Sequence, residues 1–444
     1  MLRINNIVFL LKNNAFRRQA IKQYKKALKN ESLSYKCLSE LNFKKRKKLV
    51  NYAYNNISFY KKFYDTAGFN PDMLVSDKDW EMVPILEKDM IRSNIYDIKN
   101  PFVLKKYLGV ATTGGSTGLP LKIYTDLRFH HEILGWRAFE WWNLSPAANV
   151  GIIHRRTPTT FIGKLKNRLL WWPTQRIYLN ASSIDEKQLT DFIKSIGRKK
   201  IRWLQGYVGG LERVAEYIII NNIKIDTLKL VWSTSAPLTK SIRNKLEKAF
   251  NCKVMNQYGS CEVPNIAIQC PHSHDLHVNY DYVHVDIVDD SGKLIREGEG
   301  DILVTNLESY AFPIIKYRIG DRSAWVGTEC NCNIPFPLIR EVKGRISDAI
   351  YTPDGIYVDG SYLTTIFDEY VDVISKFQVY QKRDYSVIIY VIPYNNSFPI
   401  EDTILNIKNT LLEKVHNKIS VIIQVVDTIA DDKGKIRYVI SEVL

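Results

Sequence analysis

Cysteine is scarce in this 444-residue chain, and long apolar runs are missing. Six cysteines over such a length are too few for a disulfide scaffold, so we expect reduced thiols. No apolar run reaches the roughly 20 residues that are needed to cross a bilayer. The apolar stretch at residues 4–11 is interrupted by Asn5 and Asn6, and no small-residue cleavage site follows it. We therefore expect no secretory signal and a cytoplasmic protein.

Acidic residues are rare at the start of the chain, where positive charge is concentrated. Residues 1–50 carry fourteen Lys or Arg and two Glu, which gives +12 of the net charge of +15. Such a basic arm is typical either of contact with an anionic surface or of a solvated helix face. No zinc-finger, aromatic RNA-binding or zipper motif accompanies it, which disfavours nucleic acid as a partner. The first interpretation predicts peripheral contact of residues 1–50 with the anionic inner face of the membrane.

The length of the chain predicts two or three domains. Residues 1–66 are predicted to be helical, because apolar residues recur at helical spacing around Leu49 and Ala53. From about residue 150, apolar runs alternate with helical stretches, which predicts an α/β core with a largely parallel sheet. Residues 278–326 contain short alternating segments that are typical of an antiparallel subdomain. Residues 349–444 are predicted to form a small α+β domain, with residues 1–348 as the N-terminal domain.

Hydroxyl side chains and glycines come together in the segment ATTGGSTGLPLKIY, residues 111–124. Glycines let the backbone approach a ligand closely, and backbone N–H groups with hydroxyls form a cradle for phosphate oxygens. The segment is not a Walker motif, because no Lys-Ser/Thr pair follows its last glycine. Taken alone, it could equally be a flexible surface turn.

Four later segments, together with residues 111–124, form a set of motifs. They are NQYGSCE at 256–262, KYRIGD at 316–321, VKGRISD at 342–348 and DDKGKIRYV at 431–439. In order and spacing, the set resembles the adenylate-forming superfamily of acyl-CoA synthetases and adenylation domains. It is most similar to the branch of phenylacetate-CoA ligases and CapK-like proteins, whose CapK members are associated with capsular polysaccharide synthesis. The resemblance implies a large α/β N-terminal domain with a small antiparallel β subdomain, plus a small mobile α+β C-terminal domain.

The resemblance also implies how ATP is bound. The loop that would bind the β- and γ-phosphates contains Thr113, Gly114, Gly115, Ser116, Thr117, Gly118 and Lys122, with Gly114 where many relatives have serine. The segment that would line the adenine pocket is Ser235, Ala236 and Pro237. Tyr258, followed by Gly259 and Ser260, would stack on adenine, and Asp321 would accept hydrogen bonds from the ribose hydroxyls.

Catalytic roles follow from the same resemblance. Glu262 would hold Mg²⁺, which favours a carboxylate together with substrate phosphates. Arg345 would lie near the ribose and phosphate, and Asp348 would be the hinge. Lys435 would bridge the substrate carboxylate and the α-phosphate, where a cation stabilises two anions that are brought together. Taken singly, Glu262, Asp321 and Lys435 could also be a surface carboxylate, a turn cap and a solvated lysine.

Two close pairs of metal-binding residues stand sixty residues apart, Cys270-x-His272 and Cys330-x-Cys332. Thiolates and imidazoles are the usual ligands of tetrahedral structural zinc. The spacing is tighter than usual, so partly buried free thiols are the alternative. Part of the resembling family has such pairs here, and we predict one zinc held by Cys270, His272, Cys330 and Cys332. His274 and His277 compete with His272 for the fourth position.

We therefore predict an ATP-dependent ligase that makes an acyl-adenylate and pyrophosphate, then transfers the acyl group. Coenzyme A is the acceptor that the resemblance implies by default. For a CapK-like member acting in polysaccharide biosynthesis, an amine or hydroxyl of a sugar or amino-acid derivative is the alternative. Trp136, Trp141, His154 and Tyr207 are candidates for the acid pocket, although aromatics are more often core. Two rival functions remain open: a catalytically inactive scaffold, and an acyltransferase that uses a preformed adenylate.

Overall fold

The computed structural model describes most of the chain. The described residues are 2–113, 121–154, 157–158, 160–181, 186–234, 236–327, 330–342, 350–354, 356–358, 363, 366–367, 370, 373–393, 400–429 and 438–443. The chain forms two compact units, residues 1–148 with 255–342 (unit 1) and residues 149–254 with 343–444 (unit 2). The predicted domain boundary between residues 348 and 349 stays a prediction, because residues 343–349 lie outside the described ranges.

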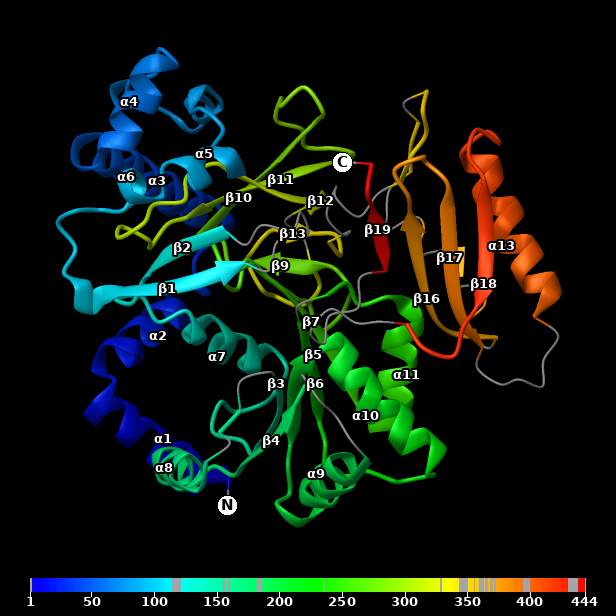
Figure 1. Ribbon diagram of the computed structural model, residues 1–444. Coiled ribbons are helices and arrows are strands. Elements are labelled where there is room, and N and C mark those ends of the chain that lie inside the picture. Colours follow the sequence, from blue (N-terminus) through cyan, green and yellow to red (C-terminus); the bar gives the residue numbers. More distant parts are fainter. Residues whose placement is uncertain are drawn as a thin grey trace. The chain divides into compact units, whose positions relative to one another are not determined.

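Helices form the first part of unit 1 (Figure 1). They are α1 (Leu2–Phe16), α2 (Arg18–Asn30), α3 (Tyr35–Asn56), α4 (Ser58–Thr66), α5 (Lys88–Ser93), α6 (Ile95–Ile98) and α7 (Glu132–Trp141), with single 3-10 turns at Pro71–Met73, Asp77–Met82 and Lys105–Tyr107. Helix α3 begins where the Ser34 hydroxyl accepts a hydrogen bond from the Cys37 amide at 3.3 Å, which is the usual N-cap arrangement. Its apolar residues Leu49 and Ala53 are fully buried. Within the described ranges, no helix combines the length and apolar character needed to cross a membrane.

The strands of unit 1 are antiparallel. A hairpin is formed by β1 (Leu108–Thr113) and β2 (Leu121–Asp126). The strands of this unit's larger part of the sheet have the order β10-β11-β12-β13-β9-β8-β7. They are β7 (Lys253–Tyr258, in this unit from Met255 on), β8 (Ala267–Gln269), β9 (Leu276–Val278), β10 (Val283–Val288), β11 (Glu299–Asn306), β12 (Tyr317–Gly327) and β13 (Leu338–Ile339). Helix α3 packs against β10, and α5 packs against β12 (Figure 1). The predicted antiparallel region at residues 278–326 corresponds to β10, β11 and β12.

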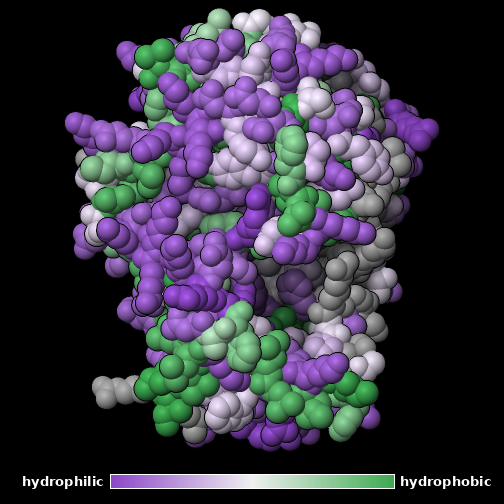
Figure 2. Space-filling model, turned by 90° about the vertical axis from the view of Figure 1, so that its left-hand side faces the viewer, coloured by the Kyte–Doolittle hydropathy of each residue, from purple (hydrophilic) through white to green (hydrophobic). Residues whose placement is uncertain are grey.

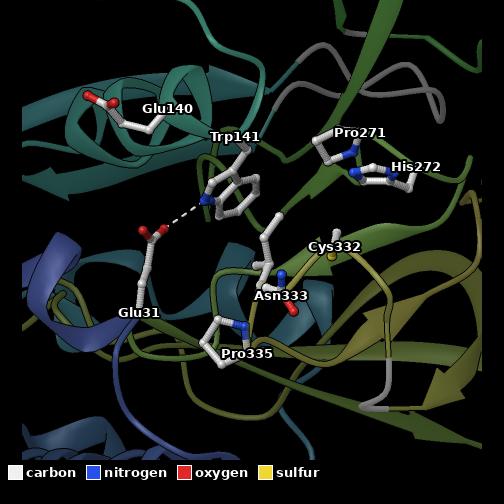
Figure 3. Close-up of a pocket in the computed structure, with 9 residues that line it drawn as sticks. Glu31, Glu140, Trp141, Pro271, His272, Cys332, Asn333 and Pro335 are labelled. Atoms are coloured by element: carbon white, nitrogen blue, oxygen red, sulfur yellow. Dashed lines mark hydrogen bonds between the residues drawn. The ribbon is translucent and has the colours of Figure 1, made fainter.

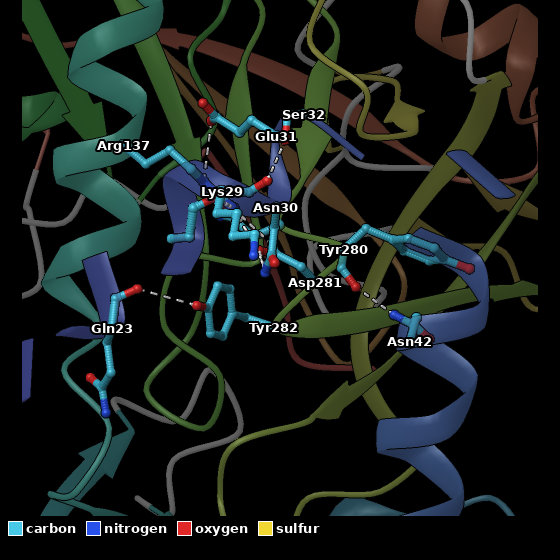
Figure 4. A network of polar contacts seen from close by, with 12 residues as sticks. Gln23, Lys29, Asn30, Glu31, Ser32, Asn42, Arg137, Tyr280, Asp281 and Tyr282 are labelled. Carbon is cyan, nitrogen blue, oxygen red and sulfur yellow. Dashed lines mark hydrogen bonds and ion pairs between the residues drawn. The ribbon is translucent and has the colours of Figure 1, made fainter. Parts of the chain in front are cut away.

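A buried polar network holds the N-terminal helices of unit 1 to the loop before β10. Arg137 of α7 donates to both carboxylate oxygens of Asp281, at 3.0 and 2.8 Å, and to Asn279 Oδ1 at 2.6 Å. Asn30, the last residue of α2, donates to Asp281 Oδ2 at 2.8 Å (Figure 4). Arg137 and Asp281 are both 0% exposed. Because a buried charge must be paired, this network fixes the positions of α2 and α7 against the loop.

The first half of unit 2 alternates strands and helices. Its elements are β3 (Val150–His154), α8 (Phe161–Trp171), β4 (Arg176–Asn180), α9 (Glu186–Arg198), β5 (Trp203–Tyr207), α10 (Val208–Ile220), β6 (Leu230–Thr234) and α11 (Lys240–Phe250). The strands pair in parallel in the order β6-β5-β3-β4. Helix α9 buries Leu189, Phe192 and Ile196 on one face, which is the spacing of an amphipathic helix that covers a sheet. This half of the unit is the parallel α/β core that the alternating pattern predicts.

The second half of unit 2 is a small α+β layer. Its elements are β14 (Ile350–Tyr351), β15 (Tyr357–Val358), β16 (Ile374–Gln381), β17 (Val387–Pro393), α13 (Glu401–Lys414), β18 (Val421–Val425) and β19 (Val439–Ser441). A four-stranded sheet has the order β18-β17-β16-β19. The central pair β16–β17 is antiparallel, and both outer strands join it in parallel. This half of the unit therefore has the mixed α+β character that the sequence predicts for residues 349–444.

Candidate functional site

The predicted phosphate-binding loop lies between the strands of a hairpin. Strand β1 ends at Thr113 and β2 begins at Leu121, and these two residues are register partners. Thr112 is likewise opposite Lys122. The antiparallel pair brings the two ends of the loop together. Thr113 is thus the last strand residue before the loop, and Lys122 is the second strand residue after it.

Several predicted site residues lie outside the described residues. They are Gly114, Gly115, Ser116, Thr117, Gly118, Ser235, Arg345, Asp348 and Lys435. Their roles therefore stay predictions from the resemblance.

Tyr258 and Asp321 lie in direct contact in unit 1, although sixty-three positions separate them in the chain. The Tyr258 hydroxyl donates to Asp321 Oδ2 at 2.9 Å. Tyr258 is the last residue of β7, and Asp321 stands in the middle of β12. Gly320, just before Asp321, has φ of +85°, a conformation that favours glycine. The two residues predicted to hold adenine and ribose are therefore neighbours.

The segment after Tyr258 turns tightly. A Cβ on Gly259 would lie 2.7 Å from the Asn265 amide nitrogen, so the position needs glycine. Ser260 closes the turn with Val263, since the Ser260 amide donates to the Val263 carbonyl and the Val263 amide donates to Ser260 Oγ, both at 3.1 Å. Glu262 leaves this turn pointing into the unit.

Glu262 is a buried carboxylate with one unsatisfied oxygen. Its Oε1 accepts a hydrogen bond from the Tyr317 hydroxyl at 3.3 Å. Its Oε2 has no hydrogen-bond partner among the described residues. A buried carboxylate oxygen without a donor is costly, and a cation would offset that cost. The sequence analysis did not predict the contact between Glu262 and Tyr317. Tyr317 belongs to the KYRIGD segment, so this motif could have indicated it as a further site residue.

In unit 2, predicted residues gather at the carboxyl ends of the parallel strands. His154 ends β3 and Tyr207 ends β5, and their rings lie 4.4 Å apart between centroids. Ala236 and Pro237 follow the end of β6, with Ala236 partly buried against the core and Pro237 exposed. The carboxyl end of a parallel sheet is where ligands bind in open α/β folds. His154, Tyr207 and the predicted adenine segment therefore share an edge that suits a ligand.

The tryptophans proposed for an acid pocket have other surroundings. Trp136 is buried and packs edge-on against Phe9 and Tyr24. Trp141 donates from Nε1 to Glu31 Oε1 at 2.6 Å. Trp136 is thus a core residue within unit 1.

Four metal-binding side chains converge at one end of the unit 1 sheet. Cys270 follows β8, His277 lies in β9, and Cys330 and Cys332 lie between β12 and β13. One ligand atom from each of the four lies within 4.8 Å of all the others. Cys270 Sγ is 3.5 Å from Cys330 Sγ, and His277 Nε2 is 3.2 Å from Cys332 Sγ. Zinc–ligand bonds of about 2.0–2.3 Å in a tetrahedron require separations of about 3.5–3.8 Å, so the cluster could hold such a metal.

The imidazole of this cluster belongs to His277, whereas the sequence analysis favoured His272. The difference follows from the strand, since β9 pairs with both β8 and β13 and carries His277 opposite Ile268 and Leu338. His277 Nδ1 lies 2.8 Å from the Phe336 carbonyl oxygen and donates to it, which leaves Nε2 as the lone-pair nitrogen. This orientation is what a metal-bound histidine requires.

His272 has a different position. Its backbone amide donates to Cys270 Sγ at 3.4 Å, while its ring lines a neighbouring pocket of about 340 Å³ with Glu31, Trp141 and Cys332 (Figure 3). In the Cys270-x-His272 pair, His272 therefore contributes a backbone amide that donates to the Cys270 sulfur. The imidazole of the cluster comes from His277.

The thiols of the cluster differ in acidity. Burial acts to raise the pKa of Cys270, but the neighbouring His277 ring and the hydrogen bond from the His272 amide lower it below its usual value. Burial, together with the neighbouring Cys330, raises the pKa of Cys332 to about 12. Thiols must lose their proton to bind a metal, so the binding of a cation here would release protons.

Comparisons with known proteins agree with these features. A family model described as the CapK C-terminal domain matches residues 350–442. Protein CapK from Staphylococcus aureus is 25% identical over 370 residues, which cover 81% of this chain and 79% of that protein. A phenylacetate-coenzyme A ligase from Thermus thermophilus is 23% identical over 374 residues, which cover 80% of each chain.

The solved structures point to the same fold. The crystal structure of 2-hydroxyisobutyryl-CoA ligase, in the postadenylation state and in complex with R3-HIB-AMP, superposes with a TM-score of 0.74. The identity is 16%, over 90% of this chain and 89% of that chain. The predicted fold class is confirmed by this likeness. The predicted resemblance is confirmed as well: the chain is a relative of CapK and of the phenylacetate-CoA ligases, it has the fold of the adenylate-forming ligases, and its residues 350–442 match the CapK C-terminal domain.

Proposed function

We propose that this protein is an AMP-forming ligase that activates a carboxylic acid as its acyl-adenylate and releases pyrophosphate. The observation that carries the proposal is the neighbourhood of Tyr258 and Asp321, joined by a 2.9 Å hydrogen bond. An aromatic face beside a carboxylate suits a nucleoside, whose base stacks and whose ribose hydroxyls donate hydrogen bonds. The relatives that are named as CoA ligases support the same reaction type.

Glu262 is proposed to hold Mg²⁺ with the phosphates of ATP. Its buried position and its Oε2 atom without a partner among the described residues fit a cation ligand. When bound, the metal would neutralise the phosphates and the leaving pyrophosphate. Tyr317 would orient the carboxylate by donating to Oε1. Arg345 and Lys435 are proposed to supply the positive charge around the α-phosphate, with Asp348 as the hinge.

The acceptor of the second half-reaction is proposed to be coenzyme A or an amine or hydroxyl of a sugar or amino-acid derivative. Coenzyme A is supported by the relatives named as its ligases. The second class is supported by the similarity to CapK, which we take to indicate polysaccharide biosynthesis. His154 and Tyr207, together at the carboxyl ends of β3 and β5, are proposed to line the acid pocket.

The cluster of Cys270, His277, Cys330 and Cys332 is proposed to be a structural zinc site. Four protein ligands leave no open position for a substrate, which favours a structural role over a catalytic one. The site would join the β8–β9 hairpin to the segment before β13.

A cytoplasmic location with peripheral membrane contact through residues 1–50 is also proposed. The support is the net charge of +12 in this segment, together with helix α1, whose Ile4, Ile7 and Leu11 are exposed. Basic residues near an anionic bilayer each contribute on the order of 1 kcal/mol, and salt weakens that attraction.

Exchange of labelled pyrophosphate into ATP, screened over a panel of carboxylic acids, tests the reaction. An acid-dependent exchange is expected, and Glu262→Gln should lower it about a hundredfold through loss of charge stabilisation. Glu297→Gln, at an exposed carboxylate, is the matched control and should leave the exchange unchanged. Nucleotide binding without any exchange would instead indicate the inactive scaffold. Consumption of synthetic acyl-adenylate without exchange would indicate the acyltransferase.

A further inference from the structure

Helix α8 is attached to unit 2 by its small and polar side. Gly163, Asn167 and Trp171 are spaced four residues apart and lie on one side of the helix. Asn167 donates to the Tyr178 hydroxyl at 2.8 Å, and the Arg176 guanidinium lies 3.3 Å from the centre of the Trp171 ring. Both partners belong to β4, so this side of α8 faces its own unit.

The opposite side of α8 is apolar and exposed. Phe161, Leu165 and Leu169 repeat at the same spacing, but they are shifted by two residues, about 200° around the helix. They are 81%, 47% and 65% exposed. Ile162 and Trp172 extend this face, and they are exposed as well. All residues of α8 are described and none of them is buried, which is the reverse of an ordinary surface helix with its apolar face inward.

Basic side chains border this apolar face. Lys164 and Arg168 lie on one side of it and Lys166 on the other, and all three are exposed. Residues 141–184 contain six Lys or Arg and no Asp or Glu. Figure 2 shows apolar side chains, in green, gathered at the lower end of the face that it presents. An apolar stripe with a basic border and no acidic residue is the pattern of a helix that lies in a membrane interface.

We propose that α8 docks the protein on an anionic lipid bilayer, with the side chains of Phe161, Leu165 and Leu169 inserted among the acyl chains. Eleven residues of helix are about 16 Å long, so α8 would lie in the plane of the interface. Lys164, Lys166 and Arg168 would contact the lipid phosphates. Trp172, at the end of the helix, would lie at the headgroup level where tryptophan is enriched. A second copy of the chain fits this face less well, because its own basic border would repel that of its partner.

Helix α8 is separate in sequence from the basic arm at residues 1–50. Its docking on a bilayer would not depend on the ligase reaction, so it would occur whether or not adenylation is observed. The full-length protein is therefore tested for vesicle binding, with no assay of its activity.

The experiment is co-sedimentation with vesicles of phosphatidylcholine alone or with about a quarter phosphatidylglycerol. We expect binding to the anionic vesicles and at least tenfold weaker binding to the neutral ones. Leu165→Glu should lower the affinity for anionic vesicles about tenfold or more, because it places a negative charge in the inserted face. Ile220→Glu is the matched control, since Ile220 is an exposed apolar residue at the end of α10, and it should leave binding within about twofold. Both positions are exposed, so both variants should fold, which thermal unfolding verifies.

A second measurement reports the depth of α8 directly. Brominated lipids should quench part of the tryptophan fluorescence of the bound protein, and Trp172→Phe should remove that part. Leu165→Glu binding as tightly as the parent would assign docking to another basic surface, including residues 1–50, and overturn the proposal. The proposal would also be overturned if the parent protein bound no vesicles. It would be overturned as well if the parent were a dimer that Leu165→Glu converts to a monomer, because a second copy of the chain would then cover this face.

Discussion

The hydroxyl of Tyr258 donates a hydrogen bond to the Asp321 carboxylate, and this contact joins the end of β7 to the middle of β12. Asp321 is almost fully buried, so its charge is held in a low-dielectric environment. The donation from Tyr258 fixes the orientation of the Asp321 carboxylate, whose oxygens accept hydrogen bonds. Tyr258 therefore has two roles in the proposed site, as a stacking surface and as the group that orients the carboxylate.

Tyr258→Phe separates these two roles. The ring remains, and a hydrogen bond to a charged group is lost, which is worth about 1.5–3 kcal/mol. We expect the KM for ATP in pyrophosphate exchange to rise about tenfold or more. Tyr54→Phe is a matched control, because Tyr54 makes a similar bond to Asp65 at 2.7 Å on an exposed surface. An unchanged KM for ATP in Tyr258→Phe would contradict the proposal that Asp321 binds the nucleotide.

The metal cluster gives a prediction that distinguishes two histidines. Purified protein should carry about one zinc per chain, and His277→Ala and Cys332→Ser should lose it. His272→Ala should retain the metal, because the cluster takes its imidazole from His277 and the His272 backbone amide remains in the variant. Metal content by mass spectrometry and the thermal unfolding temperature are the two measurements. Protein prepared without chelators that holds no zinc, or loss of zinc in His272→Ala alone, would contradict the assignment.

The contrast between His272 and His277 shows where sequence reasoning reaches its limit. Local spacing favoured His272, because only one residue separates it from Cys270. The ligand is set by the pairing of β9 between β8 and β13, which depends on contacts sixty residues apart in the chain. The α/β alternation was predictable, because α9 and the buried strands follow local periodicity. The hydrogen bond between Tyr317 and Glu262 was not, because it depends on tertiary contact.

Asp281 and Arg137 form an ion pair with no exposed surface. Asp281→Ala would leave the buried guanidinium with the more distant Glu31 carboxylate, 3.6 Å from its Nε, and the free energy of unfolding should fall by about 3–5 kcal/mol. Asp89→Ala is the control, because it breaks an exposed pair with Arg92 and should cost less than about 1 kcal/mol. Urea denaturation followed by fluorescence measures both. A cost for Asp281→Ala as small as that of Asp89→Ala would show that the network adds little to stability.

His131 makes the stability of the protein depend on pH. Burial lowers the pKa of its imidazole from 6.5 to about 4, against the opposing charge of Asp126. The folded protein thus binds this proton less readily than the unfolded chain. The contribution of His131 to the free energy of unfolding is therefore largest above about pH 6.5. It falls as the pH drops towards 4 and then levels off, and the free energy of unfolding decreases by about 3 kcal/mol in all.

His131→Asn should flatten that part of the pH profile, as thermal unfolding between about pH 4 and 7 would measure. His416→Asn, at an exposed histidine, should leave the profile as in the parent. A parent profile that is already flat in this window, or an equally steep one in His131→Asn, would contradict the assignment of the proton to His131.

The proposed roles of Lys435 and Asp348 rest on the resemblance. If Lys435 bridges the carboxylate and the α-phosphate, it serves the first half-reaction only. Losing a positioned charge at the developing transition state costs roughly 3 kcal/mol or more, about a hundredfold in rate. Lys435→Ala should therefore nearly abolish pyrophosphate exchange, yet still consume acyl-adenylate supplied from outside. Lys433→Ala is the matched control, since it removes a lysine from the same segment and should affect neither step.

Asp348→Pro should have the opposite effect. A proline fixes φ near −65°, so a hinge that must change its backbone angles between the half-reactions would be held in one orientation. We expect adenylation to persist and acyl transfer to fail, as measured with the active acid, synthetic acyl-AMP and the acceptor. The two variants together form the test, because a general loss of folding would impair both steps in both proteins. If Lys435→Ala keeps adenylation within about threefold of the parent, the lysine does not supply the charge that the reaction requires.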